Sequence, residues 1–113
     1  MAQRSHYVAR YRYAVDLTQD GLARLEMWDV LGCKIVDVGC VEEGSALPPP
    51  RIEADLSHAS LLVHPKAMSS LLDVLRHGEG VFMRVDNTAP GYVTFETSGE
   101  LDISAAQPRE QSQ

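Results

Sequence analysis

Three of the four histidines and both cysteines are the side chains that we weigh first as ligands of a metal ion. His58, His64 and His77 lie within one stretch of the chain, after Cys33 and Cys40. Zinc sites usually draw such ligands from closely spaced pairs, as in CxxC or HExxH, and neither spacing occurs here. We interpret the histidines as solvated or helix-capping side chains, and we expect neither a metal nor another cofactor.

Asp73 and His77, four residues apart in a predicted helix, are the second chemical candidate. A carboxylate that holds an imidazole is half of the relay that activates a nucleophile. The same pair is typical of an exposed helix surface, where a cation near the C-terminus is favourable. No glycine-rich phosphate loop, GxSxG elbow or dinucleotide motif accompanies the pair. We therefore expect no catalytic residues and no enzymatic activity.

The segment 16–21, with the sequence DLTQDG, carries a third motif. It resembles the D-x-[ST]-x-x-G signature of PilZ domains, with Thr18 in the serine position, and this resemblance implies binding of cyclic di-GMP. The family also uses an RxxxR pair ahead of this signature. The arginines that precede it here have other spacings: Arg4, Arg10 and Arg12. We interpret Thr18–Gly21 as a hairpin turn with a glycine bulge. A small-ligand or nucleotide site near this turn, or between helix and sheet, is the alternative function.

The composition is that of a globular chain with an acidic balance. Its 113 residues suit one domain, and 44% hydrophobic with 23% charged residues is ordinary for a packed fold. The 10 basic and 16 acidic residues give a formal net charge of −6, which opposes binding to a phosphate backbone. Nucleic acid is therefore a disfavoured partner. A local basic patch stays open because several arginines lie in the first half: Arg4, Arg10, Arg12, Arg24 and Arg51.

Cys33 and Cys40 bear on the cellular compartment. They lie seven residues apart in one predicted strand, so their side chains point to opposite faces and cannot pair. Free thiols indicate a reducing compartment. The first residues lack the apolar run of a signal peptide, and no stretch is long enough to cross a bilayer. We expect a cytoplasmic protein without a membrane partner.

The elements that must position these residues begin with a strand of strictly alternating polarity, from about residue 6 to the hairpin turn. Pairing through that turn places Leu17 opposite Ala23 on the apolar face and Arg12 opposite Trp28 on the other. The remaining pairs expected from this register are Val15 with Leu25, Tyr13 with Met27, and Asp16 with Arg24.

A third strand, about Cys33 to Val41, has two possible registers. An even loop before it adds Val36, Val38 and Cys40 to the core, whereas an odd loop would bury Asp37 without a partner. We expect the even loop, which leaves Ile35 beside Trp28 on the outer face. The prolines that follow read as a rigid connector: Pro48, Pro49 and Pro50.

The segment Pro65–His77 predicts the only strong helix. Pro65 suits the first helical position and Gly78 the stop. Apolar residues recur at helical spacing and form one stripe: Ala67, Met68, Leu71, Leu72, Val74 and Leu75. We expect the helix to lie flat on the sheet, with Leu71 and Leu75 near the centre of the buried stripe.

These elements predict one α+β domain over residues 1–103, followed by a disordered polar tail over 104–113. An antiparallel sheet of about five to seven strands, some from later apolar stretches, carries one α-helix on one face. The opposite face presents Trp28, Ile35, Arg12 and Leu22, a mixture typical of interaction surfaces. We therefore expect a non-enzymatic protein-interaction module. Its partner is a second copy, giving a homodimer, or a larger protein to which it serves as adaptor or small acidic inhibitor.

Overall fold

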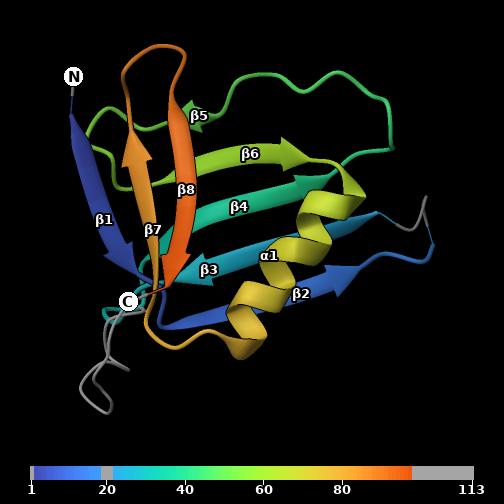
Figure 1. Ribbon diagram of the computed structural model, residues 1–113, viewed down its shortest axis with the longest axis horizontal. Helices are drawn as coiled ribbons and strands as arrows, with labels where there is room; N and C mark the ends of the chain where they lie inside the picture. The colour runs from blue at the N-terminus through green and yellow to red at the C-terminus, as the bar shows by residue number, and fades with distance from the viewer. Residues whose placement is uncertain (1, 19–21, 98–113) are drawn as a thin grey trace, which may run out of the picture.

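The computed structural model describes residues 2–18 and 22–97, and in that part it has an α+β fold with eight strands and one helix (Figure 1). The elements are β1 (Gln3–Tyr7), β2 (Arg10–Val15), β3 (Ala23–Trp28), β4 (Lys34–Cys40), β5 (Arg51–Ile52), β6 (Ala59–Val63), α1 (Pro65–His77), β7 (Val81–Asp86) and β8 (Tyr92–Thr97). The predicted fold class is confirmed. The predicted domain end at residue 103 and the tail 104–113 lie outside the described residues.

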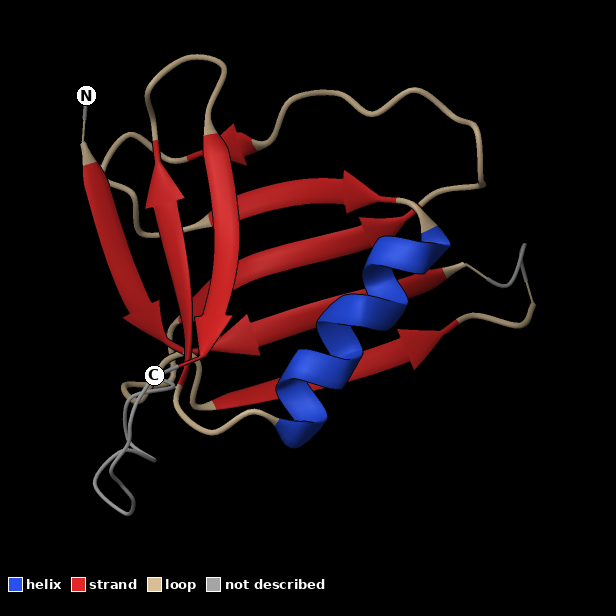
Figure 2. Ribbon diagram, viewed as in Figure 1, coloured by secondary structure: helices blue, strands red, loops and turns tan. Residues whose placement is uncertain are grey.

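The strands form two sheets instead of the single sheet that we expected (Figure 2). One has the order β1-β7-β8 and the other β2-β3-β4-β6-β5. The division starts where the long alternating segment changes partner. The amide of Val8 donates to the carbonyl of Val81 over 2.9 Å, whereas the amide of Ala9 donates to the carbonyl of Trp28 over 2.8 Å. A segment predicted as one strand therefore bends sharply and joins both sheets.

β4 and β6 run parallel, which departs from the antiparallel order of the other described strand pairs. Parallel neighbours need a connection that carries the chain back along the sheet. Residues 41–58 make this connection, and in Figure 1 their loop runs back beside the sheet to the short strand β5. The prolines Pro48–Pro50 lie in this loop, where the sequence predicted a connector.

The core lies between the five-stranded sheet and a second layer that α1 and the three-stranded sheet form (Figure 1). Leu25 pairs with Val38 and Met27 with Val36, so the even register predicted for the third strand is confirmed. The buried hydrophobic residues come from both layers: Val8, Ala23, Leu25, Met27, Ile35, Val36, Val38, Cys40, Leu56, Ala59, Met68, Leu72, Val81, Met83 and Val85.

The hairpin between β2 and β3 is shifted by two residues from the predicted register. Val15, not Leu17, pairs with Ala23. The strand ends early because the Asp16 carboxylate accepts hydrogen bonds from the Thr18 amide (3.0 Å) and hydroxyl (2.6 Å), which curls the chain into a local turn. The other observed pairs are Tyr13 with Leu25, Tyr11 with Met27, Arg12 with Glu26 and Arg10 with Trp28. A two-residue shift leaves every side chain on its predicted face.

Ile35 is only 1% exposed, so its predicted place on the outer face is wrong. The register between β3 and β4 shifts just there, because Met27 pairs with Val36 whereas Trp28 pairs with Lys34. Ile35 is the extra residue of this irregularity and turns into the core instead of keeping the alternation.

α1 spans Pro65–His77, as the sequence predicted, and the Gly78 amide closes it by donating to the Val74 carbonyl over 2.8 Å. Its most buried residues are Met68 and Leu72, whereas Leu71 and Leu75, the expected centre of the stripe, are half-buried. Within the described residues no helix has the length and apolar character needed to span a membrane.

Candidate interaction surface

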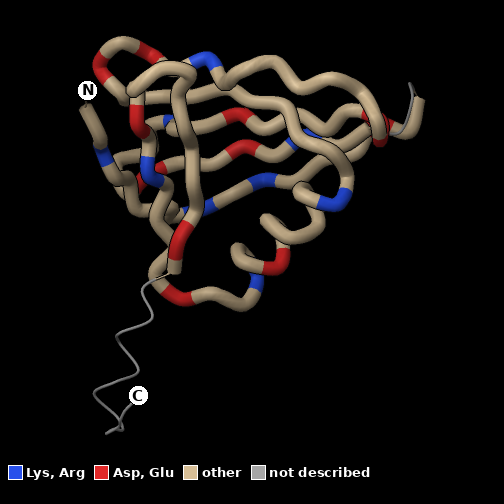
Figure 3. The backbone as a smooth tube through the Cα atoms, turned by 45° about the horizontal axis from the view of Figure 1, so that its top comes forward, with Lys and Arg blue, Asp and Glu red and all other residues tan. Residues whose placement is uncertain are grey.

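The side of the five-stranded sheet that faces away from α1 is called the outer face here. Strand registers assign its residues, because paired residues share a face. They are Arg10, Arg12, Ala14, Arg24, Glu26, Trp28, Lys34, Asp37, Gly39, Arg51, Ser60 and Leu62. Figure 3 marks the basic and acidic positions along these strands. Basic side chains outnumber acidic ones on this face, although the whole chain has a net charge of −6.

Both carboxylates of the outer face are held by neighbouring cations. Lys34 Nζ lies 2.8 Å from a Glu26 oxygen and 3.2 Å from an Asp37 oxygen. His58 Nε2 lies 2.9 Å from the other Asp37 oxygen, and Arg12 is 3.9 Å from Glu26. The hydrogen bond from Lys34 lowers the pKa of Glu26, and the same bond raises the pKa of Lys34. The negative charge at the centre of the face is therefore neutralised from within.

Trp28 is half-buried on this face beneath a cation. The Arg10 guanidinium carbon lies 4.2 Å from the centre of the Trp28 ring, and Lys34 Nζ lies 6.0 Å from it. Such a stack is favourable because the ring face is electron-rich. The predicted cation–π contact is thus made by Arg10 instead of Arg12, as the register shift requires.

A cavity of about 620 Å³ opens on the outer face between Arg24 and Arg51. Gly39 and Leu62 contribute to its lining. The Leu62 side chain packs closely on Gly39, since a Cβ there would come within 2.9 Å of Leu62 Cδ2. The connecting loop contributes Pro48 and Pro49 to its lining.

Arg24 and Arg51 both line this cavity from the outer face, but they lie on different strands. Arg24 is on β3 and Arg51 is on β5, and β4 and β6 lie between these two strands. Among the residues described, neither guanidinium has an ion pair or a side-chain hydrogen bond. Their donors are therefore available to a ligand, unlike those of Lys34.

The four residues predicted for the interaction surface do not stay together. Trp28 and Arg12 lie on the outer face, and Ile35 lies in the core. Leu22 is half-buried and lines one cavity beside Tyr13 and α1 and another near the hairpin, which Arg24 and Leu62 also line. The predicted interaction surface left out three members of the outer face, Arg10, Arg24 and Arg51, although the local basic patch that the sequence left open included them. The polar parity of the alternating strands was the available signal for the first two.

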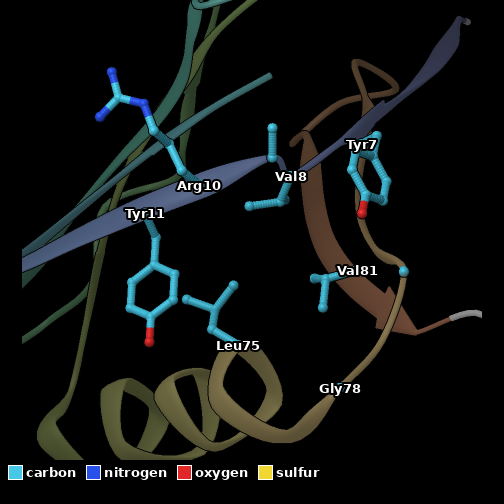
Figure 4. A pocket seen from close by; sticks show the side chains of 9 residues that line it. Tyr7, Val8, Arg10, Tyr11, Leu75, Gly78 and Val81 are labelled. Atoms are coloured by element: carbon cyan, nitrogen blue, oxygen red, sulfur yellow. The ribbon is translucent and has the colours of Figure 1, made fainter. Parts of the chain in front are cut away.

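The alternative ligand positions are a cleft between helix and sheet and the region near the hairpin. Beside the helix, Tyr11 and Leu75 contribute to a cavity of about 300 Å³ (Figure 4), and a second cavity has about 210 Å³. Near the hairpin, a cavity of about 860 Å³ includes Val15, Leu17 and Thr18 in its lining. The turn residues 19–21 of the PilZ-like segment lie outside the described part.

The histidines named as possible ligands lie in separate environments. His64 donates to the carbonyl of Ser45 over 2.7 Å, whereas His58 binds Asp37 on the outer face. His77 contacts the backbone carbonyl of Asp73, not its carboxylate, over 3.3 Å. Over residues 2–18 and 22–97, no three metal-ligating side chains gather in one place. Cys33 is exposed and Cys40 buried, and both are free.

Comparison of the chain with protein-family models, with curated proteins and with solved structures gives no match.

Proposed function

We propose that this protein is a non-enzymatic binding module whose outer face takes an acidic segment of a protein partner. The observation that carries the proposal is the pair of unengaged guanidiniums, Arg24 and Arg51, on opposite sides of the cavity of about 620 Å³. Cavities of this size are typical of ligand sites. Arginine binds carboxylates through two parallel hydrogen bonds, so each of the two can hold one acidic side chain.

The chemistry of the cavity suits a segment that mixes charge with an apolar side chain. Leu61 and Leu62 contribute to its lining, and Pro48 and Pro49 contribute from the loop. An apolar side chain can pack against these groups while flanking carboxylates meet the arginines. Trp28 lies on the same face and offers the kind of aromatic anchor that is enriched at binding hot spots.

A protein partner fits this face better than nucleic acid does. The chain as a whole is acidic, and such a field repels a phosphate backbone at long range. The carboxylates of Glu26 and Asp37 also lie among the cations. The surplus of basic side chains on this face favours an acidic segment as its ligand over a basic one.

The proposal can be tested with Trp28 as the reporter, because it is the only tryptophan in the chain. The probe is a synthetic peptide in which glutamates flank one leucine, and the control peptide replaces every glutamate with glutamine. We expect the glutamate peptide to shift Trp28 emission in a saturable manner. Arg24→Glu and Arg51→Glu should each weaken binding at least about tenfold, since a hydrogen bond to a charged group contributes roughly 1.5–3 kcal/mol.

Lys66→Glu is the matched control variant. It makes the same change of charge, but on the exposed surface of α1, and an acidic residue in the first helical turn is favourable. It should leave peptide affinity unchanged. If all three variants weaken binding equally, net charge and not the outer face explains the binding.

The second candidate function is binding of a small organic anion in the same cavity. Citrate serves as its probe. Saturable binding of citrate that depends on Arg24 and Arg51, without binding of the glutamate peptide, would favour this candidate. Tighter binding of a single-stranded oligonucleotide than of the glutamate peptide would reject the protein-partner proposal.

A further inference from the structure

β2 is an edge strand with an unusually open surface. Among the described strands it has one neighbour, β3, and all six of its residues are exposed. Tyr11, Tyr13 and Val15 retain 36%, 39% and 41% of their exposure although they point to the side of the sheet that α1 covers. An edge strand presents backbone donors and acceptors that another strand can pair with.

The side chains of β2 are sorted onto two faces. The inner side carries Tyr11, Tyr13 and Val15, whose partners on β3 belong to the core. The outer side carries Arg10 and Arg12, followed by Ala14 and Asp16. In a symmetric dimer whose twofold axis is perpendicular to the sheet, two β2 strands meet antiparallel and like faces stay together.

Charge decides which residue can lie on that twofold axis. An axis at Arg12 would place Arg12 against its own copy, and like charges directly opposite each other are destabilising. An axis at Tyr13 instead places Arg12 opposite Ala14 and Arg10 opposite Asp16. An axis at Ala14 also avoids a clash of charges, but it shifts the pairing toward the end of the strand.

The axis at Tyr13 also matches the apolar side. Tyr13 then meets its own copy, and Tyr11 meets Val15, so the three exposed side chains cover one another. Aromatic and β-branched residues are favourable cross-strand pairs. This register pairs residues 11–15 of β2 with the same residues of the second copy, and Arg10 then falls opposite Asp16, which directly follows the strand.

We propose that two copies of this chain associate through β2, antiparallel, with Tyr13 on the twofold axis. The inference goes beyond the proposed outer-face function and does not depend on it. The two five-stranded sheets become one continuous sheet, with both α1 helices on the same side. In Figure 1 β2 is the outermost of the described strands at this edge of the sheet.

The first test is sedimentation equilibrium of the full chain. The wild type should be a reversible dimer. Tyr13→Lys should raise the dissociation constant at least about tenfold, because it places like charges in contact at the axis. Tyr92→Lys is the matched control: Tyr92 is an exposed tyrosine of β8 in the other sheet, and its replacement should leave the dimer intact. A wild type that stays monomeric overturns the proposal, as does a dimer that Tyr13→Lys leaves unchanged.

The second test fixes the register and remains informative if Tyr13→Lys fails to fold. Cys33→Ser removes the exposed native thiol, and single cysteines are then introduced by Tyr13→Cys or Ala14→Cys. Directly opposed residues of antiparallel strands have Cα atoms about 4.5–5.5 Å apart, within the range of a disulfide. Mild oxidation should cross-link Tyr13→Cys and not Ala14→Cys. Cross-linking at position 14 alone, or at neither position, overturns the register.

Discussion

Truncation of Leu72 to alanine should cost more stability than the same change at its neighbour Leu71. Leu72 is 7% exposed and packs between α1 and the five-stranded sheet, whereas Leu71 is half-buried. The lost transfer free energy is about 0.8 kcal/mol for each buried carbon group that is removed. A residual cavity usually raises the cost of Leu→Ala to about 2–5 kcal/mol.

The structure around Leu72 narrows this range. Leu72 lies at a cavity of about 210 Å³ beside Met68 and Pro65, so neighbouring groups have room to relax after truncation. We therefore expect Leu72→Ala to lower the free energy of unfolding by about 2–3.5 kcal/mol, the lower half of the usual range for Leu→Ala. This is a large fraction of the roughly 5–15 kcal/mol that holds a domain of ordinary size.

Urea unfolding measures the free energies, with Asp73→Ala as the control on the exposed side of α1. That control should change stability by no more than about 0.5 kcal/mol. The reasoning is refuted if Leu71→Ala proves costlier than Leu72→Ala. The helix would then be rotated by about 100°, the angle between successive residues, and the stripe expected from the sequence would be correct.

Two further predictions concern the outer face and the irregularity beside it. The pKa of Glu26 is lowered in the fold by the hydrogen bond from Lys34. A group with a lowered folded-state pKa stabilises the fold above its unfolded value, near 4.5, and loses this contribution as the pH falls through the folded value. Acid titration of the urea midpoint should therefore show a fall below that pH, and Lys34→Gln should reduce it; an unchanged acid profile in Lys34→Gln would contradict the assignment. Ile35→Ala should cost about 2–5 kcal/mol because Ile35 is buried, whereas Val30→Ala, in an exposed loop, should cost no more than about 0.5 kcal/mol. Thermal melts compare the stabilities of the two variants, and equally small losses would show that Ile35 is exposed and not buried.

The elements that the sequence predicts correctly are those with strong local signals. α1 begins and ends at the predicted residues because Pro65 and Gly78 bracket a stripe of helical spacing. The register of β4 could be predicted because the alternative register would bury the Asp37 carboxylate without a partner, which is energetically unfavourable. In both cases a nearby residue excludes the competing arrangement.

The features that escape the sequence depend on contacts between distant segments. The shift between β2 and β3 is two residues, and an alternating pattern cannot detect it because every side chain keeps its face. The burial of Ile35 requires a local irregularity that breaks the alternation. The cavity on the outer face joins Arg24 to Arg51 only because the chain returns to place β6 parallel to β4.

The outer face and the dimer edge both include β2, so the variants must be chosen to disturb only one of these two surfaces at a time. Arg10 and Arg12 belong to the outer face and also to the edge that pairs in the dimer, so a change at either one would affect both activities. Arg24 and Arg51 lie away from the edge, on β3 and β5, and Tyr13 points to the opposite side of the sheet. Loss of peptide binding in Arg24→Glu with an intact dimer, together with loss of the dimer in Tyr13→Lys with intact peptide binding, would show that the surfaces act independently. In the dimer both outer faces lie on the same side of one sheet, so the basic patches of the two copies become neighbours and a partner with two acidic segments can engage both at once.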